Sequence, residues 1–399
     1  MNNAQVLWIK VWGIAALQGA ITLSWVIYNL YLPILLIQLG LSSKIAIALL
    51  IGENALEAVI EPVFGEFSDR QQQFLGSRIP LITLGILLSS VLFIAFPSLI
   101  IFDRSKTFSR WLLPLLAVAW ASAMAIFRSP AMSLLGRCAP TDQLPQAASI
   151  LSLVGGLIGA FRFDAYGLIL QMGASFAFAL GSLSLLITGA ILRWLNPPEV
   201  PGIVERKPQA FFKWRLGLIF LTGMLVGWGM RFLVPTVSQI LAFQLGSENS
   251  KIAMTVFFMV LGLSAIPAGK IGTKLGNSGA MMMGCSILTV SATFLVLVPS
   301  PSIKYIAIAF LTIGLSLVLN GAIPYALSLA STAHSGLGVG MYFGGLNAGV
   351  SLFGFVFDRL GKTNITTGTF GTLISFVLVL ICLYFSQKIF SSDFQKNTQ

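Results

Sequence analysis

The sequence predicts an all-α integral membrane protein with twelve transmembrane helices in two six-helix bundles related by an internal repeat. Three observations support this fold class: the composition, a series of long apolar windows, and a set of motifs that occurs twice. Of the 399 residues, 56% are hydrophobic and only 9% are charged, and the mean hydropathy is +0.89. Soluble domains carry about 25% charged residues, so a water-soluble protein is excluded.

Apolar windows account for nearly the whole chain. About 20 consecutive apolar residues are enough to cross the hydrocarbon core of a bilayer as a helix. Twelve such windows can be placed, at 11–37, 45–64, 80–101, 111–135, 147–170, 174–195, 215–241, 251–268, 280–299, 304–330, 336–357 and 368–388. The remainder is short loops and one longer linker, so no soluble catalytic domain is expected.

Basic residues predict the orientation of these spans. Lys and Arg are in excess on the side that holds both ends of the chain and the central linker, where Arg206 and Lys207 lie. The positive-inside rule then places both termini in the cytoplasm of a multi-pass protein, expected in a bacterial inner (plasma) membrane. The same asymmetry explains the formal charge of +11, so no nucleic-acid partner is expected.

Motifs of the first half recur in the second. The segments Gln38–Gly40 and Ser43–Ala46 recur as Gln244–Gly246 and Ser250–Ala253, each time between the first and second helix of a half. Such repeats are typical of transporters whose two halves rock around a central site.

The repeat divides the chain into three parts. We expect an N-terminal six-helix bundle at 1–195, a cytoplasmic linker at 196–213 and a C-terminal six-helix bundle at 214–399.

One loop motif resembles a known family. Pro62–Arg70 reads PVFGEFSDR and is followed by Arg78; it resembles the motif between helices two and three of the major facilitator superfamily. Gly269–Gly276 resembles the degenerate copy of that motif in the second half. The resemblance implies the major facilitator fold, in which helices one, four, seven and ten line the cavity.

Part of the same motif also weakly resembles the branch of cation-coupled sugar transporters that includes sucrose and glycoside carriers. The resemblance rests on Ser68–Arg70 and Gly76–Pro80. Ser77 and Ile79 replace two basic residues that are usual in that branch.

Three glutamates form a stripe inside a membrane-length helix. Glu53, Glu57 and Glu61 are four residues apart within the window 45–64, so they lie about 6 Å apart along one side of a helix. Acids at membrane depth are costly unless they are paired, protonated or in contact with water. Arg128 lies at a similar depth and could bridge Glu53 or Glu57, leaving the other to carry a proton. The alternative is a static network that braces the first bundle.

A gate is expected near the cytoplasmic surface, built from Glu61, Asp69, Arg70 and Arg78. Asp69 can accept hydrogen bonds from a helix N-terminus of the other bundle, and the two arginines can neutralise neighbouring carboxylates. The alternative is that these charges only fix the topology.

Substrate-binding candidates surround the expected cavity. Arg231 lies in the middle of the seventh span, where its guanidinium could hold a carboxylate, a phosphate or a sugar hydroxyl. The other candidates are aromatic and amide side chains: Trp25, Tyr28, Asn29, Trp228, Asn320, Tyr342 and Asn347. These types suit a polar, ring-shaped solute; the alternative for part of the set is packing or a place at the membrane interface.

These features predict a secondary active transporter and not an enzyme. The only histidine and the three separate cysteines offer no metal-binding spacing, so neither metal nor cofactor is expected. We expect a monomeric, proton-coupled symporter that moves a small polar solute, a sugar or an organic anion, by alternating access. Its partners would be that solute, protons and membrane lipids.

The competing hypothesis is a non-transporting membrane protein on the same scaffold, acting in lipid or pigment handling or in assembly of a membrane complex. The centre of the molecule discriminates between the two. A sealed, apolar centre with fully paired glutamates favours the second hypothesis, and a wet cavity with Arg231 exposed favours transport.

Overall fold

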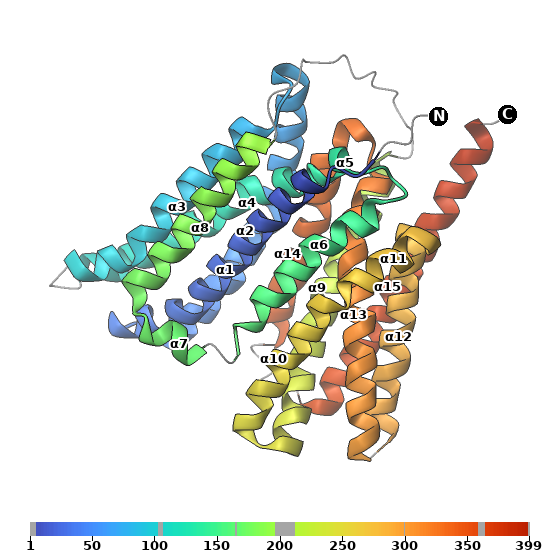
Figure 1. Ribbon diagram of the computed structural model, residues 1–399. Coiled ribbons are helices and arrows are strands. Elements are labelled where there is room, and N and C mark those ends of the chain that lie inside the picture. Colours follow the sequence, from blue (N-terminus) through green and yellow to red (C-terminus); the bar gives the residue numbers. More distant parts are fainter. Residues whose placement is uncertain are drawn as a thin grey trace.

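The computed structural model describes residues 5–102, 107–163, 166–195, 212–298, 300–357 and 364–397, and every regular element within them is helical (Figure 1). The α-helices, in chain order, are α1 (Trp8–Gln38), α2 (Ser43–Leu75), α3 (Ile79–Phe102), α4 (Thr107–Ser133), α5 (Leu135–Cys138), α6 (Leu144–Ala160), α7 (Tyr166–Gln171), α8 (Ala174–Leu195), α9 (Phe212–Leu245), α10 (Ser247–Leu263), α11 (Ala265–Leu275), α12 (Asn277–Leu297), α13 (Pro301–Leu329), α14 (Ser335–Phe357) and α15 (Ile365–Asn397). A 3-10 turn, η1 (Thr332–His334), precedes α14.

Among the described residues, 10 helical segments are long and apolar enough to cross a membrane. α10 and α11 together form one of them, Ser247–Leu275. α2 is outside this set: it has 33 residues, but its apolar stretch carries the glutamate stripe. α6 is apolar but has only 17 residues. A membrane protein with multiple helical spans is therefore confirmed.

The first and second halves of the sequence each pack mainly within themselves. α1 packs against α6 and α8, and α3 against α4 and α8; in the second half α12 packs against α13 and α15, and α9 against α15. The halves meet along two seams, where α14 packs along α2 and where α10 and α11 pack along α6. The predicted linker, 196–213, lies outside the described residues except for its last two positions.

The start of α1 and the end of α15 lie at the same end of the molecule (Figure 1). We call this the terminal end and the other the far end. α2 runs from the far end to the terminal end, so its glutamates lie in the middle and Asp69 lies near the terminal end.

Glycines make the seams close. On α14, Gly340 faces the backbone of Glu61 on α2, and Gly345 faces the backbone of Phe220 on α9, each without room for a side chain. On the other seam, Gly156 of α6 meets Gly262 of α10 backbone to backbone. Small residues of this kind allow membrane helices to approach closely.

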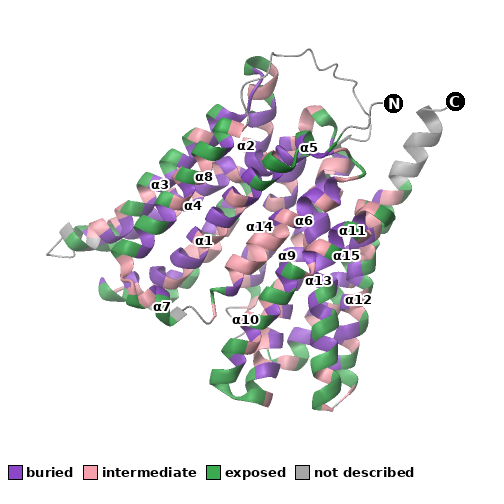
Figure 2. Cartoon of the chain, viewed as in Figure 1, coloured by how far each residue is buried: buried purple, intermediate pink, exposed green. Residues whose placement is uncertain are grey.

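The outward surface is apolar. Figure 2 shows exposed residues on the outward sides of α3 and α12. They include Leu84 and Val91 on α3, at 61% and 67% exposure, and Val290 and Leu297 on α12, at 56% and 70%. Large exposed aliphatic side chains on long helices are expected where the surroundings are lipid.

Candidate functional site

A cavity of about 360 Å³ lies between the two halves of the sequence. Its walls come from α1 and α6 of the first half and from α9, α10, α13 and α14 of the second half. Its polar and aromatic wall residues include Gln18, Thr22, Trp25, Asn29, Ser152, Arg162, Phe258, Tyr342 and Phe343. A mostly apolar cavity with a few polar groups is the usual form of a small-molecule site.

One face of α1 supplies much of the polar wall. Gln18, Thr22, Trp25 and Asn29 are spaced so that they share a side of the helix. The Asn29 amide donates to the Trp25 carbonyl at 2.7 Å. Trp25 Nε1 is buried and has no hydrogen-bond partner among the described residues, so the wall retains an unused donor.

Beside this cavity, Glu53 is held by a tyrosine. Tyr28 Oη donates to Glu53 Oε1 at 2.5 Å, and both side chains are almost fully buried. Glu53 Oε2 has no partner among the described residues. Tyr28, predicted as a substrate residue, therefore contacts a glutamate, and the cavity wall does not include it.

Arg128 of α4 joins the next two glutamates of the stripe. Its Nε donates to Glu61 Oε1 at 2.6 Å, and its guanidinium lies 3.5 Å from Glu57 Oε2. The Ser129 hydroxyl donates to the other oxygen of Glu61. Two carboxylates thus share one arginine inside the protein, which compensates only one negative charge.

Glu57 is also bound from the second half of the chain. Asn347 Nδ2 on α14 donates to Glu57 Oε2 at 2.8 Å, while Glu57 Oε1 has no partner among the described residues. Arg128 lies 4.9 Å from the ring centroid of Phe343, which lines the cavity. The charged group therefore contacts one residue of the cavity wall.

Glu61 is placed differently from the expectation. The sequence suggested a position near the surface, within the gate, because the apolar window ends at Phe64. The helix instead continues to Leu75, and Glu61 is fully buried beside Arg128. Glu66, Asp69 and Arg70 therefore lie on the helical turns that follow the apolar window.

At the terminal end, Asp69 connects α2 to the start of α14. Its carboxylate accepts hydrogen bonds from the backbone N–H groups of Gly336, at 2.9 Å, and Leu337, at 2.8 Å. Anions are favoured at a helix N-terminus, where unpaired N–H groups converge. Burial raises the pKa of the Asp69 carboxyl, while Arg78 and the two N–H groups act in the opposite direction. The carboxylate thus depends on these partners to stay ionised.

Arg78 completes this contact, which we call the terminal lock. Its guanidinium donates to Asp69, to Ser133 Oγ at the end of α4, and to Ser335 Oγ at 2.8 Å. Both Arg78 and Asp69 are 2% exposed, so the ion pair is buried. Arg70 takes no part in it: that side chain is 62% exposed and pairs with Glu66 on its own helix at 2.6 Å.

The remaining predicted substrate residues occupy three settings. Tyr342 lines the cavity with its hydroxyl unpartnered among the described residues. Asn320 donates to the Pro145 carbonyl at 3.1 Å, across the two halves. Trp228 packs edge-on against Phe353 with ring centroids 6.1 Å apart.

Arg231 is exposed, just past the middle of α9. Its guanidinium lies 5.5 Å from the centroid of the Phe353 ring. The preceding residue, Met230, lines the cavity, so Arg231 lies beside the cavity and outside its described wall.

Sequence reasoning did not select several residues of these clusters. Ser129, Ser133 and Ser335 cannot be distinguished by their sequence positions, because serine is common in membrane helices. Gln18 and Thr22, in contrast, could have been found from their helical spacing with Trp25 and Asn29.

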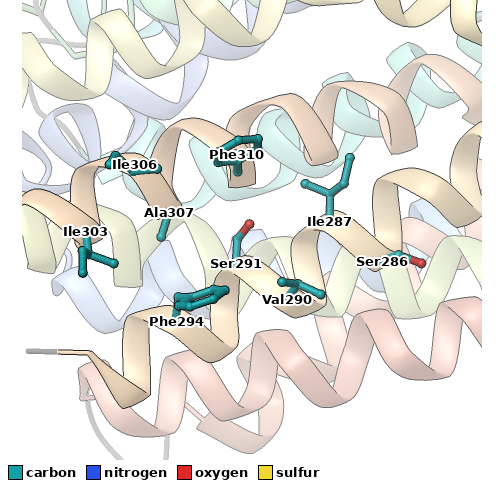
Figure 3. A pocket seen from close by; sticks show the side chains of 9 residues that line it. All are labelled: Ser286, Ile287, Val290, Ser291, Phe294, Ile303, Ile306, Ala307 and Phe310. Carbon is teal, nitrogen blue, oxygen red and sulfur yellow. The ribbon is translucent and has the colours of Figure 1, made fainter.

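A second pocket, of about 420 Å³, lies between α12 and α13 (Figure 3). Aliphatic and phenylalanine side chains form its wall with two serines, and no titratable side chain lines it. Val290, Ile306 and Phe310 of this wall are more than half exposed. The pocket is therefore part of the apolar outer surface.

Within the described part of the chain, no three His, Cys, Asp or Glu side chains are grouped as a metal site requires.

Comparison with known proteins identifies the family. The family model described as Major Facilitator Superfamily matches residues 14–354. No curated protein sequence matches the chain.

Three solved structures share the fold. The human organic anion transporter MFSD10 (TETRAN) has a TM-score of 0.70 at 14% identity, covering 94% of this chain and 99% of that one. A bacterial homologue of the iron transporter ferroportin in the outward-facing state scores 0.75 at 12% identity, covering 95% and 99%. FucP in the outward conformation scores 0.68 at 12% identity, covering 94% and 98%. The chain belongs to the major facilitator superfamily, a family of membrane transporters and not of enzymes.

Proposed function

We propose that the protein is a secondary active transporter that moves a small polar solute, a sugar or an organic anion, by alternating access and in symport with protons. In this proposal α2 and α6 complete twelve spans, in two six-helix bundles at 1–195 and 214–399. The protein acts as a monomer in a bacterial inner membrane, with both termini and the linker 196–213 in the cytoplasm.

The observation that carries the proposal is the double hold on Glu57. Arg128 approaches it from the first half and Asn347 binds it from the second half. A proton on Glu57 would neutralise the carboxylate and weaken both interactions, because charge-assisted hydrogen bonds are about twice as strong as neutral ones. Protonation would therefore loosen one contact across the α2–α14 seam.

The shared arginine gives the network two charge states. With Glu57 and Glu61 both ionised, the cluster carries one uncompensated negative charge in a buried setting, which is costly. One proton removes that charge and leaves the Arg128–Glu61 pair, which has the shorter separation, 2.6 Å against 3.5 Å. We assign proton carriage to Glu57, with Glu53 as a second site bound to Tyr28.

The terminal lock acts as the cytoplasmic gate in this mechanism. Asp69 and Arg78 hold the terminal ends of α2, α4 and α14 together, and opening that side requires these bonds to break. Glu61 belongs with the proton network, and Arg70 contributes only surface charge.

The cavity supports transport over the non-transporting alternative. A space of about 360 Å³ separates the halves, Arg231 is exposed, and Glu53 and Glu57 each retain an oxygen with no partner among the described residues. A scaffold with a purely structural role needs none of these features.

Proteoliposomes test the proposal directly. Purified protein is reconstituted, and uptake of radiolabelled sugars and organic anions is measured with and without an inward proton gradient. We expect a gradient to drive accumulation of at least one solute. Glu57→Gln should abolish that accumulation while solute exchange persists, because a neutral amide cannot release a proton. Glu66→Gln, an exposed change on the same helix, is the control. Unchanged accumulation in Glu57→Gln would reject the assignment of the proton site.

A further inference from the structure

Two arginines from opposite halves of the chain lie near each other beside the cavity. Arg162 lies two residues after the end of α6 and lines the cavity, and Arg231 follows the cavity residue Met230 on α9. Both side chains are exposed, and they are near enough for their positive charges to repel each other. Neither guanidinium forms a hydrogen bond or ion pair with another described residue, and that of Arg231 lies over the Phe353 ring.

This arrangement differs from that of the buried cations in the same protein. Arg78 contacts Asp69 and Arg128 contacts two glutamates. A cation within a membrane protein is costly unless a counter-charge or water stabilises it. Two neighbouring guanidinium groups add repulsion to that cost, so their position favours binding of a negative charge between them.

Two further features of the cavity wall indicate the chemistry of the ligand. The residues that line it include no Asp or Glu, so its charge is positive at the Arg162 side. Its aromatic residues are Trp25, Phe258, Tyr342 and Phe343, which suit a ring or another flat apolar group. Guanidinium groups bind carboxylates and phosphates through two parallel N–H···O bonds.

We propose that the transported solute is an organic anion, whose carboxylate or phosphate binds between Arg162 and Arg231 while its body occupies the aromatic cavity. This inference rests on the proposed transport function and narrows its substrate class. The site also has a mechanical role. Since the two arginines belong to different halves, an anion between them replaces repulsion by attraction and draws α6 and α9 together beside the cavity. Neutral sugars lack this effect.

Matched ligands test the site by equilibrium binding to the purified full-length protein. The probes are benzoate, phenyl phosphate and the neutral isostere benzamide, and binding is measured by calorimetry and by the shift of the melting temperature. We expect at least one of the two anions to bind at least about tenfold more tightly than benzamide, since a hydrogen bond to a charged group contributes enough for that factor.

Three variants locate the binding. Arg162→Gln and Arg231→Gln should each weaken binding of the anion by about tenfold. Arg193→Gln, which removes an exposed charge at the end of α8, should leave it unchanged. Arg231→Lys keeps the charge but loses the two-pronged geometry, and should retain part of the affinity. The melting temperature without ligand shows whether each variant is folded, and the lysine variant keeps the test valid if a glutamine variant is not.

Several outcomes would overturn the inference. They are equal binding of benzamide and both anions, or anion affinity in both glutamine variants equal to that of Arg193→Gln. Loss of anion binding in nanodiscs of phosphatidylglycerol, but not of phosphatidylcholine, would assign the arginines to lipid headgroups and also reject it.

The inference and the proposed function fail separately. Anion binding without proton-driven uptake would count against the coupling alone. Proton-driven accumulation of a neutral sugar without anion binding would count against the anion site alone.

Discussion

The terminal lock predicts a measurable change in local opening when Asp69 is replaced by Asn. The substitution keeps the shape of the side chain but removes its charge. Gly336 and Arg78 both donate to Oδ1, and Leu337 donates to Oδ2. In the variant one oxygen can still accept, while the new amide group faces at least one of these donors. Breaking one partner of a buried ion pair costs about 3–5 kcal/mol. At about 3 kcal/mol, the equilibrium for opening the first turn of α14 should rise by more than about 100-fold.

Hydrogen–deuterium exchange with mass spectrometry measures this opening. In Asp69→Asn, the peptide that contains Gly336 and Leu337 should exchange more than about 100-fold faster, while peptides from α12 keep their rates. Glu66→Gln is the matched control, because its partner Arg70 is exposed and surface ion pairs contribute about 0–1 kcal/mol. Exchange at the wild-type rate in a folded Asp69→Asn protein would refute the reasoning, since it would mean that Asp69 does not hold α14.

Three further predictions concern the interior. Arg128→Met should reduce the free energy of unfolding by about 3–5 kcal/mol, because it leaves buried glutamates uncompensated. The melting temperature should fall accordingly, and a value within a degree of wild type would contradict the ion-pair geometry. Gly345→Leu should prevent close approach of α14 to the backbone of Phe220 and reduce the yield of folded protein, whereas full recovery on size-exclusion chromatography would contradict the seam. Asn347→Ala should reduce proton-driven accumulation more than solute exchange in proteoliposomes, and an equal loss of both would argue for a purely structural contact.

The sequence was sufficient to predict an all-helical membrane protein with multiple spans and its family, because the bilayer imposes strong constraints on length and composition. Apolar windows, the repeat and the loop motif are all readable from residue types, and the family match agrees with them. The contacts of Asp69 with a helix N-terminus followed from the same motif. Here a chemical rule applied to a charged residue is enough to predict its partner.

Side-chain partners within the glutamate stripe could not be predicted in the same way. Depth estimates from helical rise place residues only to within one helical turn, and Glu57 and Glu61 are about one turn apart. Such estimates therefore cannot tell which of the two Arg128 contacts, and in the structure it contacts both. The directions in which the side chains of Tyr28 and Asn347 point depend on how their helices are rotated about their axes. Tertiary packing determines that rotation.

The glycine seams of α14 have a consequence for motion. Helices that interlock through large side chains can change their relative position only by moving those side chains between rotamers, which creates a barrier. On α14, Gly340 and Gly345 present almost bare backbone to α2 and α9, so there are few ridges to displace. Small shear displacements along these surfaces keep the area of contact and require little repacking. The polar contacts of Glu57 and Asp69 then determine the stable positions of α14. The glycine-lined surfaces between those contacts keep the barrier to sliding low.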